Sequence, residues 1–166
     1  MEGRATALGA GTVLNALATG TGAAFALDIE TSARVELDGT GTVDGKIDAA
    51  PEADTALIER CVELVLERYG DGEGGHVRTE SAVPLAAGLK SSSAAANATV
   101  LATLAALDVT VAGAGDADIT ADDVALTREA ACRIGVQAAR DVGVTVTGAF
   151  DDASASMLGG VTVTDN

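Results

Sequence analysis

The sequence predicts an α+β fold in which a mixed β-sheet packs against helices. Within residues 22–37, apolar and polar side chains alternate toward the end of the run, which is the period of a half-exposed strand. Residues 54–69 instead repeat apolar side chains at helical intervals, and residues 91–107 form an alanine-rich run suited to close packing. Because the strand-like runs precede the helical ones, a layered α+β arrangement is favoured.

The first part of the chain has the character of strands. A short strand is expected at residues 4–10, ending at Gly11, and two further strand runs are expected at 24–29 and 33–37. Residues 38–46 are rich in glycine, aspartate and threonine, so they predict a turn or hairpin.

The helix expected at residues 54–69 has a signal at each end. Pro51 precedes it and Gly70 follows it, at the positions where these residues favour a helix start and a helix stop. Its apolar residues, three and four positions apart, are Leu57, Ile58, Cys61, Val62, Leu64, Val65 and Tyr69. They form a stripe that predicts one buried helix face.

Strands and helices follow one another in the rest of the chain. A strand at residues 76–83 is expected to lead into the alanine-rich helix at 91–107. Beyond it we expect a polar connection at 108–120, a helix at 121–140, strands at 144–147 and 160–164, and a helix start at 150–157.

Charge is the strongest compositional signal. The chain has 25 acidic and 10 basic residues, a formal net charge of −15, and only two lysines, Lys46 and Lys90. High salt screens self-repulsion of this size, so we expect a halophilic cytoplasm; an acidic interaction surface is the alternative, although the charge is dispersed. Nucleic acid is not an expected partner, because binding its phosphates needs clustered lysine and arginine.

Membrane, secretory and metal-site signals are missing from the sequence. There is no run of about 18 apolar residues for a membrane span, and the N-terminus does not resemble a signal peptide. Cys61 and Cys132 lie far apart in helix-like segments, so buried, reduced thiols are expected rather than a disulfide or a metal site. His76 is the only histidine, so neither a Ser-His-Asp triad nor a zinc cluster can be argued around it.

The most informative segment runs from residue 84 to residue 94. Gly88 permits a sharp bend, and Ser91, Ser92 and Ser93 follow it at the start of the alanine-rich helix. Unpaired N–H groups and the helix dipole favour an anion at such a helix start. The hydroxyls can cap the helix, which is their common role, or bind phosphate and magnesium. The segment therefore predicts an anion cradle for a nucleotide.

The order Pro-x-x-x-Gly-Leu-x-Ser-Ser-x-Ala in this segment resembles the phosphate-binding motif of the GHMP kinases, the superfamily of galactokinase, homoserine kinase, mevalonate kinase and phosphomevalonate kinase. It differs from the common P-loop, which needs Gly-Lys-Ser/Thr after its spacer. The resemblance implies a GHMP kinase N-terminal domain (ribosomal protein S5 domain 2-like) over residues 1–166, with ATP and Mg²⁺ as cofactors. The ATP-binding residues that it implies are Pro84, Leu85, Ala86, Ala87, Gly88, Leu89, Lys90, Ser91, Ser92, Ser93 and Ala94.

The same resemblance assigns catalytic roles near residue 150 and at the cradle. Asp151, in the segment Phe-Asp-Asp-Ala, matches the family's catalytic aspartate, and Asp152 stands where the family has asparagine. Both aspartates could instead cap a helix, and we expect that role for Asp152. Lys90, a scarce lysine beside the cradle, is expected to act on phosphate or acceptor, with a chance surface position as the alternative.

Two further charged residues match family positions. Arg4 follows Gly3, as does the family's cation near the acceptor hydroxyl, although a lone N-terminal arginine is usually solvated. Glu129 is the only glutamate between the serine segment and Asp151, so it is the candidate magnesium ligand together with Ser92. An exposed helix acid is the alternative for Glu129.

The cradle and the run Leu-Gly-Ala-Gly-Thr-Val-Leu-Asn-Ala at residues 8–16 look like those of archaeal-type shikimate kinases. That resemblance implies transfer of the ATP γ-phosphate to the 3-hydroxyl of shikimate, with Thr12, Asn15 and Asp28 as acceptor-binding candidates. Thr12 and Asn15 could equally be turn residues. The alternatives are a homoserine or mevalonate kinase, an inactive nucleotide-binding fragment, and an acidic scaffold without a ligand.

The resemblance covers nearly all of the 166 residues. It leaves out the family's third, glycine-rich motif, which belongs to a C-terminal lobe. We therefore expect the N-terminal portion of a longer protein, and assembly into a homo-oligomer stays open.

Overall fold

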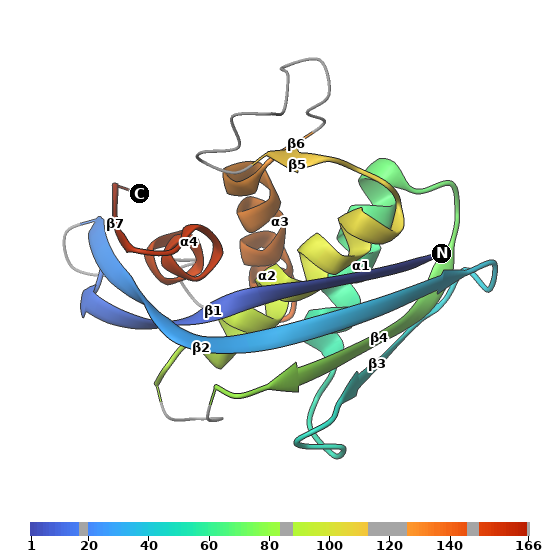
Figure 1. Cartoon of the computed structure of the whole chain (residues 1–166), viewed down its shortest axis with the longest axis horizontal. Coiled ribbons are helices and arrows are strands. Elements are labelled where there is room, and N and C mark those ends of the chain that lie inside the picture. The colour runs from blue at the N-terminus through green and yellow to red at the C-terminus, as the bar shows by residue number, and fades with distance from the viewer. Residues whose placement is uncertain (17–19, 84–87, 113–125, 146–149, 166) are drawn as a thin grey trace.

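The computed structural model describes residues 1–16, 20–83, 88–112, 126–145 and 150–165 (Figure 1). Its elements in chain order are β1 (Glu2–Leu14), β2 (Thr21–Asp38), β3 (Val43–Ile47), α1 (Ala56–Tyr69), β4 (Gly74–Ser81), α2 (Ser91–Ala106), β5 (Val111–Ala112), β6 (Leu126–Thr127), α3 (Arg128–Asp141), α4 (Phe150–Leu158) and β7 (Val161–Asp165).

The main sheet is mixed, as the sequence predicted. Its strand order is β1-β2-β4-β3, and β7 pairs with the first residues of β2. Within the described part of this sheet, β3 and β4 run parallel and the other pairs are antiparallel; β5 and β6 form a separate parallel pair. The helices lie on one side of this sheet, and α4 lies where β1, β2 and β7 curl round it (Figure 1). The fold therefore brings the starts of α2 and α4 to the curled end of the sheet.

Most predicted elements are confirmed, with four differences. The two runs at 24–29 and 33–37 belong to one long strand, β2. Residues 43–47 of the expected hairpin form the strand β3, which pairs with β4. Glu59 of α1 holds this strand in place by accepting a hydrogen bond from the Gly45 N–H at 2.9 Å. Tertiary pairing here overrides a turn-like local composition.

The other two differences concern the second half. Helix α3 begins at Arg128, after the short strand β6, whereas the sequence predicted a helix from residue 121; residues 121–125 lie outside the described residues. Val144 and Thr145 are not in a strand, and the rest of that expected strand is likewise outside the described part.

Helix α2 packs closely against the sheet because small residues meet there. Ala98, Ala102 and Ala106 of α2 are buried against β1 and β2. A Cβ atom placed on Gly3 of β1 would lie 2.0 Å from the Ala102 carbonyl oxygen, so only glycine fits this contact. The core thus gains contact through short distances rather than through large side chains.

The sheet face turned away from the helices is charged. Arg4, Arg34, Arg78 and Lys46 stand opposite one another across the four paired strands. Like charges in such a row repel, and acids offset the repulsion: Glu2, for example, lies 2.8 Å from Arg4 and 3.0 Å from Arg34. In the part of the chain that the structure describes, no helix has the length and apolar character that crossing a membrane requires.

Candidate functional site

The start of α2 has an unusual backbone. Gly88 (φ 74°) and Lys90 (φ 56°, ψ 41°) both adopt the left-handed conformation, which glycine reaches freely and lysine rarely does. The Leu89 carbonyl between them accepts a hydrogen bond from the Ala10 N–H of β1 at 3.2 Å. Lys90 is the N-cap residue, and its side chain makes no capping hydrogen bond. The turn therefore presents the first N–H groups of α2 without a side-chain cap at Lys90.

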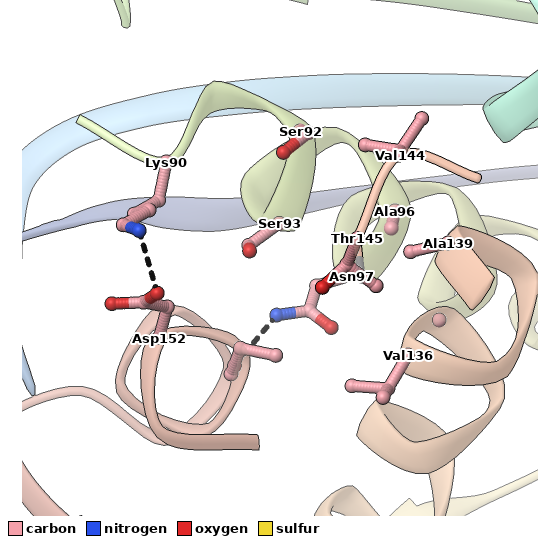
Figure 2. Close-up of a pocket in the computed structure, with 12 residues that line it drawn as sticks. Lys90, Ser92, Ser93, Ala96, Asn97, Val136, Ala139, Val144, Thr145 and Asp152 are labelled. Atoms are coloured by element: carbon pink, nitrogen blue, oxygen red, sulfur yellow. Dashed lines mark hydrogen bonds and ion pairs between the residues drawn. The ribbon is translucent and has the colours of Figure 1, made fainter. Parts of the chain in front are cut away.

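A cavity of about 140 Å³ opens at this helix start. It is lined by Lys90, Ser92, Ser93, Ala96, Asn97, Gly135, Val136, Ala139, Val144, Thr145, Asp152 and Ala153. Figure 2 shows the hydroxyls of Ser92 and Ser93 above the start of α4 and the Lys90 side chain reaching toward Asp152. Three helices thus meet at a space that has hydroxyls on one side and a carboxylate on the other.

Lys90 and Asp152 are the charged residues that line this cavity among those described. The Lys90 Nζ atom lies 2.7 Å from Asp152 Oδ2, and Thr12 Oγ1 of β1 donates a hydrogen bond to Asp152 Oδ1 at 2.7 Å. Both carboxylate oxygens therefore have partners from other elements. Asp152, which we expected to cap a helix, instead ties β1, α2 and α4 together.

The Asp151 carboxylate points elsewhere. The residue is 1% exposed, and its buried Oδ1 atom has no hydrogen-bond partner among the described residues. Its Oδ2 atom lies against Gly22 of β2, where an added Cβ would be only 2.5 Å away. A buried carboxylate oxygen without a partner is costly, so its burial calls for a functional explanation.

The structure brings only part of the predicted set to this cavity. Lys90, Ser92 and Ser93 line it, and Thr12 reaches it through Asp152. Ser91 and Ala94 lie in the first turn of α2 but do not line the cavity, and Gly88 and Leu89 form the turn before it. Residues 84–87, with Pro84, Leu85, Ala86 and Ala87, lie outside the described residues.

The remaining candidates lie away from the cavity. Arg4 is exposed on the charged sheet face with Glu2, and Glu129 is paired with Arg133 at 2.8 Å on the surface of α3. Asn15 and Asp28 are exposed and do not line the cavity. Among the described residues, no three His, Cys, Asp or Glu side chains gather as ligands of a metal ion would.

Sequence reasoning missed two features of the site. Asn97 faces the cavity from the second turn of α2, and nothing in the local sequence separates it from the neighbouring small residues. The contact of Asp152 with Lys90 was also missed, although an aspartate at a position where the family has asparagine was a signal for it.

Comparison with known proteins places the fold and the chain. The family described as GHMP kinases N terminal domain matches residues 56–160. Across its whole length, the chain is 68% identical to a shikimate kinase of Halobacterium salinarum strain R1 and covers 54% of that protein. It is 54% identical to a shikimate kinase of Methanosarcina mazei, again over 100% of the chain, and covers 52% of that protein. The chain therefore spans about half the length of the curated relatives it matches.

Solved structures share the fold at low identity. A mevalonate kinase crystal structure superposes with a TM-score of 0.71 at 11% identity, covering 100% of this chain and 54% of that one. A homoserine kinase from Cytophaga hutchinsonii superposes with a TM-score of 0.70 at 15% sequence identity, and the match covers 98% of this chain and 48% of that one. A structure described as MDDEF in complex with MVAPP, AMPPCP and magnesium superposes with a TM-score of 0.67 at 18% sequence identity, and the match covers 98% of this chain and 46% of that one.

Proposed function

Because this chain belongs to the GHMP kinase family, we propose that it is the nucleotide-binding half of a shikimate kinase, which transfers the ATP γ-phosphate to the 3-hydroxyl of shikimate. The observation that supports this most is the cavity at the start of α2, with Ser92, Ser93 and Lys90 around it. The acceptor rests on the relatives named shikimate kinase. The chain's net charge of −15 suits a salt-rich cytoplasm.

The residues at the start of α2 fit a nucleotide's phosphates. The left-handed turn at Gly88 and Lys90 leaves the first N–H groups of the helix free of a side-chain cap from Lys90, and such groups bind anions. Ser92 and Ser93 offer hydroxyls to phosphate oxygens or to Mg²⁺ from the cavity wall. When bound, ATP with Mg²⁺ supplies the phosphoryl group and a divalent charge that offsets the phosphates.

The cavity itself offers Mg²⁺ little from the protein. Glu129, the ligand implied by the family resemblance, is on the surface with Arg133, so Ser92 is the better placed of the two. Mg²⁺ commonly keeps waters and phosphate oxygens as ligands and needs few from the protein.

Asp151 is the proposed acceptor of the hydroxyl proton. Among the described residues its Oδ1 atom has no hydrogen-bond partner, so it has the capacity to accept a hydrogen bond from an acceptor hydroxyl that reaches this buried position. Gly22 leaves the room that the carboxylate needs. Asp152, the next residue, is paired with Lys90 and Thr12. The two aspartates therefore have different roles, with Asp151 as the proton acceptor and Asp152 as the partner of Lys90. We place the acceptor between Asp151 and the Thr12 end of β1.

A coupled assay of ADP release tests the proposal. The 166-residue chain and any longer protein that contains it would each receive MgATP with shikimate, homoserine or mevalonate. We expect turnover with shikimate, and loss of turnover with retained nucleotide binding in Asp151→Asn. The matched control is Asp44→Asn, an exposed acid on the opposite face of the sheet. Turnover with homoserine alone would overturn the acceptor assignment.

Titration with MgATP separates the remaining alternatives. Nucleotide binding without turnover by either protein would favour an inactive nucleotide-binding protein. Absence of binding to both would overturn the whole proposal and leave an acidic scaffold.

A further inference from the structure

The lysine at the mouth of the cradle is already occupied by a carboxylate. Lys90 Nζ lies 2.7 Å from Asp152 Oδ2, and Thr12 fixes the other oxygen at 2.7 Å. With one lysine and one aspartate, the side chains that line the cavity carry formal charges that cancel. The cradle that we assign to the nucleotide phosphates thus has one lysine, Lys90, and the carboxylate of Asp152 neutralises its charge.

This pair is more than a contact on an open surface. The side chain of Lys90 is 34% exposed and that of Asp152 is 12% exposed, so solvent screens the pair less than two fully exposed charges. The bond from Thr12 prevents the carboxylate from rotating away. Lysine has a long, flexible side chain, and here its ammonium is held in one position between the starts of α2 and α4 (Figure 2).

We propose that Asp152 is a positioning residue that keeps the Lys90 ammonium from binding the phosphates of the nucleotide in the ground state. This inference rests on the proposed function. An ammonium that bound the phosphates equally before and during transfer would tighten binding without raising turnover. Held by Asp152 between the two helix starts, Lys90 remains available to the charge that develops during transfer.

Removal of the Asp152 charge should therefore strengthen nucleotide binding and slow the reaction. In Asp152→Asn, Lys90 is released toward the phosphates, and we expect MgATP to bind about fivefold tighter. Turnover should fall, because the ammonium is no longer held where the charge develops. KM and kcat should therefore fall together, which is the pattern expected when a substitution strengthens substrate binding in the ground state and not in the transition state. A purely structural role for Asp152 would weaken nucleotide binding instead.

Calorimetric titration with MgATP at one fixed KCl concentration tests this on the wild type, Asp152→Asn, Lys90→Met and the double variant. The gain in affinity should disappear in the double variant, because it depends on Lys90. Asp48→Asn is the matched control, since it also removes an acid from an ion pair, with Arg78 at 2.6 Å on the far sheet face. If Asp152→Asn does not fold, Thr12→Val tests the same idea, with a smaller gain in affinity expected.

The scarcity of lysine gives a second readout. Lys90 and Lys46 are the only lysines, so amine labelling followed by mass spectrometry reads Lys90 against Lys46 as an internal reference. We expect MgATP to protect Lys90 strongly in Asp152→Asn and weakly in the wild type.

Equal protection in both proteins, or no gain in affinity in Asp152→Asn and Thr12→Val, would overturn the inference while leaving the nucleotide site intact. A wild-type protein that binds no MgATP would instead overturn the proposed function.

Discussion

Asn97 in the second turn of α2 donates a buried hydrogen bond from Nδ2 to the Ala153 carbonyl of α4 at 2.9 Å (Figure 2). Asn97 is 1% exposed, so removing its amide would leave a buried carbonyl with one partner fewer. The bond joins the helix that carries the serines to the helix that carries Asp151 and Asp152. It therefore fixes the distance between the two halves of the proposed site.

Replacing Asn97 with leucine should destabilise the protein by about 1–3 kcal/mol, because the Ala153 carbonyl would stay buried without its donor. Urea unfolding at constant salt measures the change. Gln137→Ala is the control, since its amide bonds to Asp141 on the surface, and its effect should stay within about 0.5 kcal/mol. Similar values for the two variants would show that the α2–α4 bond contributes no more than a surface contact.

Gly22→Ala tests how Asp151 is placed. The new methyl group would lie 2.5 Å from Asp151 Oδ2 and 2.9 Å from its Cβ, so the carboxylate or strand β2 must move. Overpacking of this kind costs about 1–3 kcal/mol. Stability and ADP release should therefore both fall, the latter because the proposed proton acceptor is displaced.

Gly39→Ala is the glycine control for that experiment. A Cβ at Gly39 would meet nothing within 4 Å among the described residues, so stability should stay the same or rise by up to about 1 kcal/mol, and turnover should not change. Unchanged stability in Gly22→Ala would mean that the space beside Asp151 is larger than the structure describes.

The ion pair between Arg60 of α1 and Asp141 of α3 predicts a pH dependence. The Arg60 hydrogen bond, with a smaller contribution from Gln137, holds the pKa of the Asp141 carboxyl below its ordinary value. The unfolded chain therefore binds the proton at a higher pH than the folded one, and folding is favoured wherever the carboxylate is ionised. This stabilisation is present above the unfolded pKa of about 3.9 and is lost as the pH falls through the folded pKa.

The difference in unfolding free energy between wild type and Asp141→Asn should accordingly shrink as the pH is lowered from 7 to 3. The same substitution in an Arg60→Met background should show a weaker trend, because the larger of the two hydrogen bonds that lower the pKa is gone and only that of Gln137 remains. A trend that persists undiminished without Arg60 would assign the pH dependence to other carboxylates.

Sequence periodicity predicted the fold where one face of an element differs from the other. Helix α1 has an apolar stripe, and its bounds agree with the expected 54–69 to within two residues. In strand β1, the polar residues Arg4 and Thr6 alternate with Ala5 and Ala7, so the alternation turns Arg4 toward the exposed face. Pairing with β2 agrees, because Arg4 stands opposite Arg34 on the charged face.

The site was harder to predict because it depends on rotation about a helix axis. Neighbouring residues on a helix point about 100° apart, so Asp151 and Asp152 cannot face the same space. Ala153 and Met157 pack into the cluster formed with α1, α2 and α3, and Ala155 packs on the sheet, so these contacts together set the rotation of α4. That rotation turns Asp152 toward the cavity and Asp151 toward Gly22. Apart from the aspartate that replaces the family's asparagine at position 152, the local sequence does not tell which of the two aspartates faces Lys90.

The two cysteines give a test of the core itself. Cys61 of α1 and Cys132 of α3 are free and belong to one buried cluster, as the sequence predicted for reduced thiols. Burial raises the pKa of the Cys132 thiol to about 12 and also raises that of Cys61. Since the thiolate is the reactive form, iodoacetamide at pH 8 should leave the native protein unmodified and alkylate both thiols in guanidinium chloride, which intact-mass spectrometry counts directly. Adducts on the native protein would mean that the α1–α3 interface opens, and failure to alkylate the unfolded chain without reductant would mean a disulfide in place of two free thiols.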